Sequence, residues 1–296
     1  GEPFFDEVAY GGWPMDVHPP EGFFYEGHPT NFIQIDDIYT IPYRCYYSKN
    51  ISNLMMAGRN ISATHIAFGS VRVMATCAIG GQAVGTAAAM VMKYDCTPRE
   101  IGQKHIEELQ QTLLRDDCYI PGVQNKDIKD LARTADIQAS SWKKGWEPHW
   151  VNNGVSRIVS AENNGWRSEE ITDKGEWIEV VFEKTSKIGE VDIKFDSDLN
   201  NEIMISISET TRNLQTPGIP KKLVKDYQVD IFDGDNFIYG FEEADNVQRF
   251  RKHIIPENVL GNRIRITCLS THGKEYATIY EVRVYEESMK SFVMEQ

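Results

Sequence analysis

The sequence lacks the cysteine pattern of a disulfide framework or of a zinc site. Its five cysteines are odd in number, include no CxxC pair and mostly lie inside apolar runs: Cys45, Cys77, Cys96, Cys118 and Cys268. Both kinds of site need cysteines paired at short, regular spacings. We therefore expect no disulfide framework and no structural metal, and the cysteines leave the cellular compartment open.

The sequence also lacks concentrated positive charge. It has 31 Lys and Arg against 44 Asp and Glu, a formal net charge of −13, and no block of basic residues. Binding to nucleic acid or to an anionic membrane needs a positive face, so the composition argues against both partners. With 41% hydrophobic and 25% charged residues, it is ordinary for a soluble globular protein.

Charged side chains are missing from the twenty residues Val73 to Met92. About 20 apolar residues can span a bilayer, and Gly81 and Gly85 have the spacing of a small-xxx-small motif. The run is nonetheless mostly Ala, Gly, Thr and Cys, contains Gln82, and has no Leu or Phe. Such residues gain little free energy on insertion into lipid, so we expect a closely packed helix and no membrane span.

The first third of the chain begins with irregular sequence. Residues 1–37 are rich in Gly, Pro and aromatic residues and are predicted to lack regular structure. The stretch "IYTIPYRCYYS" (38–48) is predicted to be a strand, with Pro42 at an edge or bend. The apolar run "LMMAG" (54–58) has the length and composition of a buried strand.

Two helices are predicted next. One runs from about Val71 to Lys93. The segment "TPRE" begins the other, with Thr97 as N-cap, Pro98 at the first helical position and Glu100 completing a capping box. Apolar residues keep roughly helical spacing from there to "RDD" (115–117), which predicts a single helix.

The pattern changes to alternation in the second half of the chain. Short runs of alternating apolar and polar residues, separated by Asn, Gly, Pro and Asp turns, predict an all-β sandwich. We assign residues 1–121 to a first domain, 122–140 to a linker and 141–296 to the sandwich. The predicted strands are 177–182, 191–195, 203–208, 227–232, 263–268 and 280–285.

The segment before the uncharged run favours a cofactor site. A strand, a turn at Gly58-Arg59 and a helix start near Gly69-Ser70 would direct the free N–H groups of a helix N-terminus at one point. Such an end carries about half a positive charge and attracts anions or electron-rich carbonyls. A core helix packed against a sheet is the alternative: it explains the small residues, but not the strand, turn and helix start that come before them.

The string "NLMMAGRNISATHIAFGSVRVMATCAIGGQAVGTAAA" resembles the C-terminal flavin-binding segment of the FAD-dependent oxidoreductases, in the branch related to fumarate reductase and succinate dehydrogenase flavoproteins. The resemblance spans about residues 8–121. It implies a partial FAD-binding, Rossmann-like α/β fragment with substrate-side loops, and so an α+β multi-domain chain. The cofactor-binding positions it implies are Gly58, Arg59, Asn60, Ser70, Arg72, Val73 and Met74.

The family's nucleotide-binding motif is missing. No G-x-G-x-x-G occurs in the chain, although this motif holds the ADP half of FAD. The sequence begins without Met, so we expect it to be a piece of a longer protein. A missing N-terminal FAD domain or a partner chain would supply that half, and we expect this chain alone to bind FAD weakly or not at all.

Candidate catalytic residues lie around the flavin segment, where a proton donor or acceptor is needed. His65 lies between the "AGR" turn and the helix start, and Asp16 and His18 lie on the loop "GGWPMDVH". Arg44, beside Tyr43, could hold a carboxylate substrate. Solvated surface side chains, and for Arg44 a surface ion pair, are the alternatives. No metal ligands are predicted.

The second half resembles a galactose-binding-like or discoidin-type β-sandwich, on the stretch "NNGWRSEEITDKGEWIEVVFEKTSKIGEVDIKFD". The resemblance implies a jelly-roll-like fold and a glycan as partner, stacked on Trp142, Trp146, Trp150 or Trp166. Tryptophans buried at the base of the sandwich explain the same residues. A calcium ion bound by its Asp- and Asn-rich turns is a minor alternative.

Two functions follow from these patterns. The first is the C-terminal portion of an FAD-dependent oxidoreductase that transfers a hydride between a small organic or sugar-derived substrate and FAD. The alternative is a non-catalytic carbohydrate-binding or scaffold protein built on the sandwich. The sugar-binding resemblance favours a periplasmic or other extracytoplasmic location.

Overall fold

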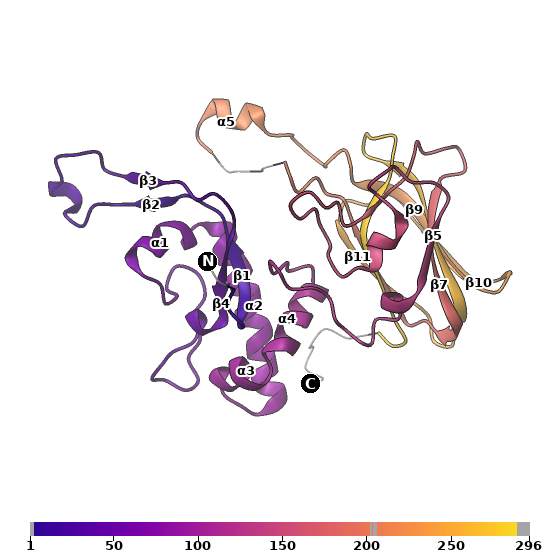
Figure 1. The fold of residues 1–296 in the computed structure, drawn as a ribbon, viewed down its shortest axis with the longest axis horizontal. Helices are drawn as coiled ribbons and strands as arrows, with labels where there is room; N and C mark the ends of the chain where they lie inside the picture. The colour runs from indigo at the N-terminus through magenta and orange to yellow at the C-terminus, as the bar shows by residue number, and fades with distance from the viewer. Residues whose placement is uncertain (1–2, 202, 204–205, 289–296) are drawn as a thin grey trace. The chain divides into compact units, whose positions relative to one another are not determined.

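The computed structural model describes residues 3–201, 203 and 206–288, and it divides the chain into two compact units, Gly1–Asn125 and Lys126–Gln296 (Figure 1). Unit 1 contains helices and two small sheets, and unit 2 is a β-sandwich. The predicted class, a mixed helical and stranded part followed by an all-β sandwich, is confirmed. The predicted limits of the two domains and of the linker stay predictions.

Unit 1 is built around a two-stranded sheet and three helices. Strand β1 (Glu7–Gly11) pairs antiparallel with β4 (Tyr39–Pro42). Helices α2 (Met74–Tyr94), α3 (Pro98–Lys104) and α4 (Ile106–Arg115) follow later in the chain. Apolar side chains from all of these elements form one core, because each helix buries a single apolar face.

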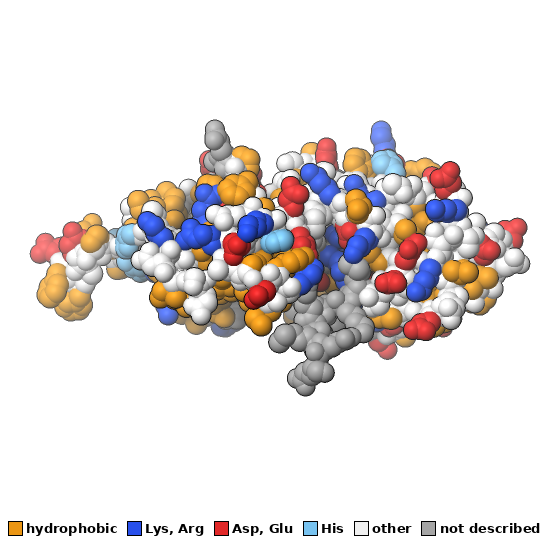
Figure 2. Space-filling model, turned by 90° about the horizontal axis from the view of Figure 1, so that it is seen from below, with side chains coloured by type: hydrophobic (Ala, Val, Ile, Leu, Met, Phe, Trp, Pro, Cys, Tyr) orange, Lys and Arg blue, Asp and Glu red, His pale blue; other side chains and the backbone are white. Residues whose placement is uncertain are grey.

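A hairpin arm projects from unit 1 (Figure 1). Strands β2 (Met15–Val17) and β3 (Asn31–Ile33) pair antiparallel, and the 3-10 turn η1 (Gly22–Phe24) lies between them. Phe23 is 97% exposed, and the end of the arm displays hydrophobic and acidic side chains (Figure 2). The base of the arm packs on the short helix α1 (His65–Val71).

Helix α2 buries a stripe of small residues and leaves the opposite face open. Thr76, Gly80, Ala83, Ala87 and Met90 are buried, at the three- and four-residue spacing of one helix face. Gly80 permits the closest approach, since a Cβ there would lie 2.5 Å from the Tyr46 ring. Among the described residues, α2 alone is long and apolar enough to cross a membrane, a test that core helices also pass.

The capping box predicted at "TPRE" is confirmed. The Thr97 side chain accepts the N–H of Glu100, and the Glu100 carboxylate accepts the N–H of Thr97 at 2.9 Å. The helix that starts here ends at Lys104, and α4 begins again at Ile106, so the predicted single helix is two.

Unit 2 is a sandwich of two antiparallel sheets. The strand order is β10-β9-β12-β7-β5 in one sheet and β11-β8-β13-β6 in the other. The strands are β5 (Asp136–Ala139), β6 (Trp166–Arg167), β7 (Glu176–Lys187), β8 (Glu190–Phe195), β9 (Val224–Asp233), β10 (Asn236–Glu243), β11 (Phe250–Ile254), β12 (Leu260–Thr271) and β13 (Thr278–Tyr285). The turns η3 (Leu131–Thr134) and η4 (Pro148–Asn152) and the helix α5 (Glu209–Leu214) lie in its connections.

The core of unit 2 follows from the alternation in its sequence. In β12, Ile264, Ile266 and Cys268 are fully buried, while the intervening Arg263 and Arg265 lie on the other face. A strand with a period of two presents one face to the core, so the alternating runs at 177–182, 191–195, 227–232, 263–268 and 280–285 all became strands.

Several local predictions in unit 1 are wrong. The segment 54–58 is not a buried strand: Met55 makes one isolated bridge with Tyr47, and Leu54 is exposed. The stretch 38–48 is a strand only to Pro42 and then forms the 3-10 helix η2 (Tyr43–Tyr46). Residues 1–37 contain three short strands.

Two further predictions need correction. The helix expected from about Val71 is two helices, because the chain is extended at Val73 between α1 and α2. In the predicted strand 203–208, the described residues 203 and 206–208 form no strand, and residues 204–205 lie outside the described residues.

Candidate functional site

The junction between α1 and α2 forms an exposed helix N-terminus. Val73 is the N-cap of α2, with φ −71° and ψ 148°, and no side chain caps the helix there. Met74, the first helical residue, is 79% exposed. The first N–H groups of a 21-residue helix therefore lack a side-chain acceptor and retain the positive end of the helix dipole.

The structure brings Arg59 near this helix end. Burial raises the pKa of the Cys77 thiol, in the first turn of α2, and the positive charge of Arg59 acts against that rise. Gly58 has a left-handed backbone with φ 91°, which lets the chain turn before Arg59. Asn60 follows in the same turn, so three of the predicted cofactor positions lie in one turn, before α1 in the chain.

The other predicted cofactor positions have partners inside unit 1. Ser70 is buried, and its hydroxyl bonds to Tyr39 Oη and to the Trp13 carbonyl. Arg72 Nη2 lies 3.0 Å from Asp16 Oδ2. Of the predicted set at this junction, Met74 is exposed and Val73 is partly exposed.

Three of the four predicted catalytic residues gather at the base of the arm. Asp16 Oδ2 lies 3.0 Å from Arg72 Nη2 and 3.5 Å from His18 Nε2. His65 Nε2 lies 3.3 Å from the His18 carbonyl oxygen. Asp16 Oδ1 is buried and has no hydrogen-bond partner in the described part of the chain. The cluster thus joins a carboxylate, two imidazoles and a guanidinium from β2 and α1.

Arg44 lies apart from this cluster. Its guanidinium forms a two-pronged ion pair with the buried carboxylate of Asp6, and it lies 5.0 Å from the centre of the Phe5 ring. Tyr43 is fully buried and donates its hydroxyl to the Pro98 carbonyl. The Arg44 guanidinium is thus paired with Asp6, the ion-pair alternative named for it, and its role as a substrate ligand stays a prediction.

An open apolar cavity of about 450 Å³ lies between the arm base, β4 and α1. Tyr39 and Ser70 meet at its polar floor. Sequence reasoning named Ser70 but missed Tyr39, because Tyr39 belongs to a run whose pattern predicts only a strand. Burial raises the pKa of Tyr39, so its phenol stays protonated. The lining residues are Phe4, Met15, Ile35, Tyr39, Thr40, Ile41, Pro42, Cys45, Ile61, Ser62, Ala63, Thr64, Ala67, Ser70 and Val71.

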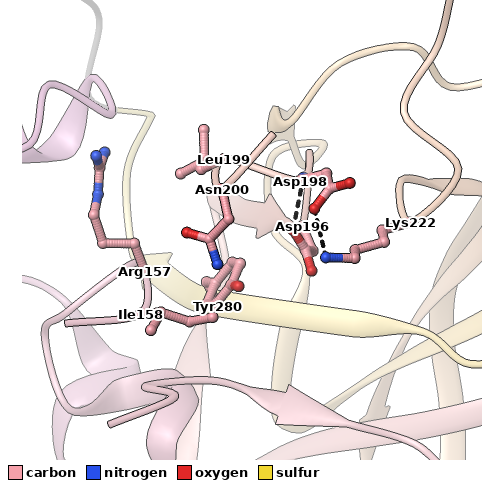
Figure 3. A pocket seen from close by; sticks show the side chains of 8 residues that line it. All are labelled: Arg157, Ile158, Asp196, Asp198, Leu199, Asn200, Lys222 and Tyr280. Carbon is pink, nitrogen blue, oxygen red and sulfur yellow. Dashed lines mark hydrogen bonds and ion pairs between the residues drawn. The ribbon is translucent and has the colours of Figure 1, made fainter. Parts of the chain in front are cut away.

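Unit 2 has a smaller, polar pocket of about 110 Å³ at the end of β8 (Figure 3). Asp196, only 2% exposed, accepts the N–H of Asp198 at 2.7 Å, and Lys222 Nζ donates to Asp198 Oδ1. Asn200 and Tyr280 face the same space (Figure 3). Carboxylate, ammonium, amide and phenol groups converge here, a set suited to ligand hydroxyl groups.

The tryptophans predicted to stack on sugars are mostly packed. Trp166 is fully buried, and Trp146 is covered by Arg167, whose guanidinium carbon lies 3.6 Å from the ring centre. Trp150 donates to Glu147, and Trp142 is about half exposed. None of the four lines the polar pocket. In the described part of the chain, no group of three or more His, Cys, Asp or Glu could hold a metal ion.

Comparison with known proteins bears on unit 1. The family model described as FAD dependent oxidoreductase matches residues 1–113. The match covers less than half of the chain. The resemblance predicted for the first part of the chain is confirmed, and the matched residues include the arm base, the Arg59 turn and the start of α2.

Solved structures resemble the chain over about half its length. A fucose-binding module of Streptococcus pneumoniae is 15% identical, with a TM-score of 0.41, covering 53% of this chain and 98% of that one. A family 32 carbohydrate-binding module of C. perfringens is 13% identical, with a TM-score of 0.39 and coverages of 53% and 98%. A chitosan-binding module of Paenibacillus is 16% identical, with a TM-score of 0.37 and coverages of 53% and 98%. No curated protein matches the chain.

The residues present fit one end of FAD. The uncapped start of α2 and the Arg59 charge suit the electron-rich edge of an isoalloxazine. Nothing in the sequence supplies the Gly-rich turn that holds the pyrophosphate. The fit is therefore to the flavin end and not to the nucleotide end.

Proposed function

We propose that unit 1 is the part of an FAD-dependent oxidoreductase that contacts the flavin ring, in an enzyme that transfers a hydride between a small substrate and FAD. The observation that carries this is the uncapped, exposed N-terminus of α2 inside the segment that matches the flavoprotein family. Val is a poor N-cap residue, so water or a bound group must accept the first N–H groups of α2.

FAD, when bound, supplies the hydride chemistry, and the protein supplies position, charge and protons. The backbone of Val73 and Met74 and the side chain of Arg59 would hold the negative edge of the flavin. Positive partial charge at this edge stabilises the reduced, anionic form, so it favours electron acceptance.

The arm base supplies the acid–base groups. Asp16 and His18, 3.5 Å apart, form a pair that can hold or pass one proton, and Arg72 fixes the carboxylate by its own bond to Oδ2. His65 contacts the same segment through the His18 carbonyl. We assign proton transfer to Asp16 and His18, with His65 beside them and Arg44 outside the group.

A second protein part is needed to hold the nucleotide half of FAD. Ala75, Ala78, Gln82, Gly85 and Ala88 on α2 are exposed, and these small side chains leave a flat, uncharged helix face. A missing N-terminal FAD domain or a partner chain would cover such a face and enclose the cofactor. An extracytoplasmic location stays a prediction.

The test measures the binding of FAD to the chain by the quenching of FAD fluorescence. We expect the chain to bind FAD weakly and to lose that binding in Val73→Asp, because an aspartate N-cap satisfies the free N–H groups and repels the flavin edge. Val73→Thr is the matched control, since it caps the helix without charge and should lose less. Equal binding by Val73→Asp and the parent chain would contradict the proposal, and tight stoichiometric FAD would contradict the missing nucleotide part.

A second candidate is binding of a neutral glycan by unit 2. The observation that favours it is the polar pocket of Asp196, Asp198, Asn200, Lys222 and Tyr280 (Figure 3). A glycan array with the parent chain and with Asn200→Ala tests it. A colourless protein that takes up no FAD but binds glycans would favour a non-catalytic carbohydrate-binding role for the whole chain.

A further inference from the structure

The unit 1 cavity has no charged group in its wall. All lining residues are apolar or carry a hydroxyl, thiol or proline ring, and Asp16, His18, His65 and Arg44 are not among them. A carboxylate moved out of water without a cation pays a large desolvation cost. The wall therefore selects an uncharged ligand, and its volume of about 450 Å³ is within the usual range for small-molecule sites.

The polar floor of this cavity has a defined hydrogen-bond direction. Ser70 Oγ donates its single proton to the Trp13 carbonyl. The bond between Tyr39 Oη and Ser70 Oγ must then use the proton of Tyr39. Both oxygens keep lone pairs but no free proton, so at this floor they accept a hydrogen bond and cannot donate one.

We propose that this cavity binds an uncharged, mainly apolar alcohol. The apolar body packs on Met15, Ile41 and Val71, and the ligand hydroxyl donates to Tyr39 Oη. The inference goes beyond the proposed oxidoreductase function, because it assigns a class of ligand to a cavity whose wall contains neither Asp16 nor His18. A carboxylate would place its own lone pairs against those of Tyr39 and find no cation.

Benzyl alcohol, benzoate and toluene are the probes, titrated into the 296-residue chain and followed by saturation-transfer NMR. We expect benzyl alcohol to bind at least tenfold more tightly than benzoate. Tyr39→Phe removes the acceptor and should weaken benzyl alcohol about fivefold, the value of one ordinary hydrogen bond, while leaving toluene unchanged.

A filling variant locates the binding site. Ala67→Phe places a ring inside the cavity and should abolish binding of both alcohol and toluene. Ala88→Phe adds the same ring on the exposed face of α2, outside the cavity wall, and should bind both probes normally. Circular dichroism of each variant shows whether unit 1 has folded.

Three results would overturn the inference: benzoate binding as tightly as the alcohol, undiminished binding in Ala67→Phe, or no binding of any probe to the folded parent chain. FAD quenching is measured on the same samples without probes. Failed alcohol binding removes the alcohol site and leaves the flavin proposal, which fails instead if Val73→Asp binds FAD as tightly as the parent chain.

Discussion

Acidification should destabilise unit 2 through one buried histidine. His253 in β11 is 7% exposed and lies between the two sheets, with its Nε2 2.9 Å from Tyr227 Oη and its ring 4.6 Å from that of Phe241. Burial, and then the positive charge of Arg251, lowers the pKa of His253 from 6.5 to about 4. Glu243 lies 3.9 Å from Nδ1, but its carboxylate is bound to Arg251 at 2.8 Å.

The sign follows from proton binding in the two states. Below pH 6.5 the unfolded chain binds a proton at His253, while the folded chain does not until about pH 4. Stability from this group is therefore complete above pH 6.5 and is lost as the pH falls towards 4. The difference of roughly 2.5 pKa units corresponds to about 3 kcal/mol, at 1.36 kcal/mol per unit.

Urea unfolding followed by tryptophan fluorescence measures this, because five of the six tryptophans lie in unit 2. Between pH 7 and pH 4.5 we expect the parent chain to lose about 2 to 3 kcal/mol more than His253→Gln, which cannot take up the proton. His149→Gln removes an exposed histidine and should follow the parent chain. The reasoning is refuted if His253→Gln and the parent chain lose the same free energy.

Three further predictions concern unit 1, all measured as free energies of unfolding. Gly80→Ala should destabilise by about 1 to 3 kcal/mol, because its Cβ would overlap the Tyr46 ring. Gly85→Ala should instead stabilise by about 0.5 to 1 kcal/mol, since nothing lies within 4 Å of its Cβ. A lower free energy of unfolding in both variants would show that α2 is packed on both faces. Thr97→Ala removes the cap that accepts the Glu100 N–H and should cost about 1 kcal/mol, and no loss would mean that the capping box contributes nothing.

Local signals in the sequence predicted the parts of the fold that depend on near neighbours. The capping box at Thr97 and the alternation of β12 each involve residues a few positions apart, so their geometry is determined within the element. The edge strands β10 and β11 went unpredicted. Their exposed residues blur the alternation, and pairing with β9 and β8 is what makes them strands.

For the candidate site too, the sequence predicted some features and the tertiary structure decided others. The sequence alone identified the segment that matches the FAD dependent oxidoreductase family model, and Asp16, His18 and His65 lie within it, because residue type and order carry that signal. The partners of these side chains depend on contacts between residues that are tens of positions apart in the chain. Examples are the Asp16–Arg72 ion pair, the hydrogen bonds that join Tyr39, Ser70 and Trp13, and the ion pair between Arg44 and Asp6. A side chain's partner depends on which backbone segments fold against it, and no spacing along one strand or helix determines that.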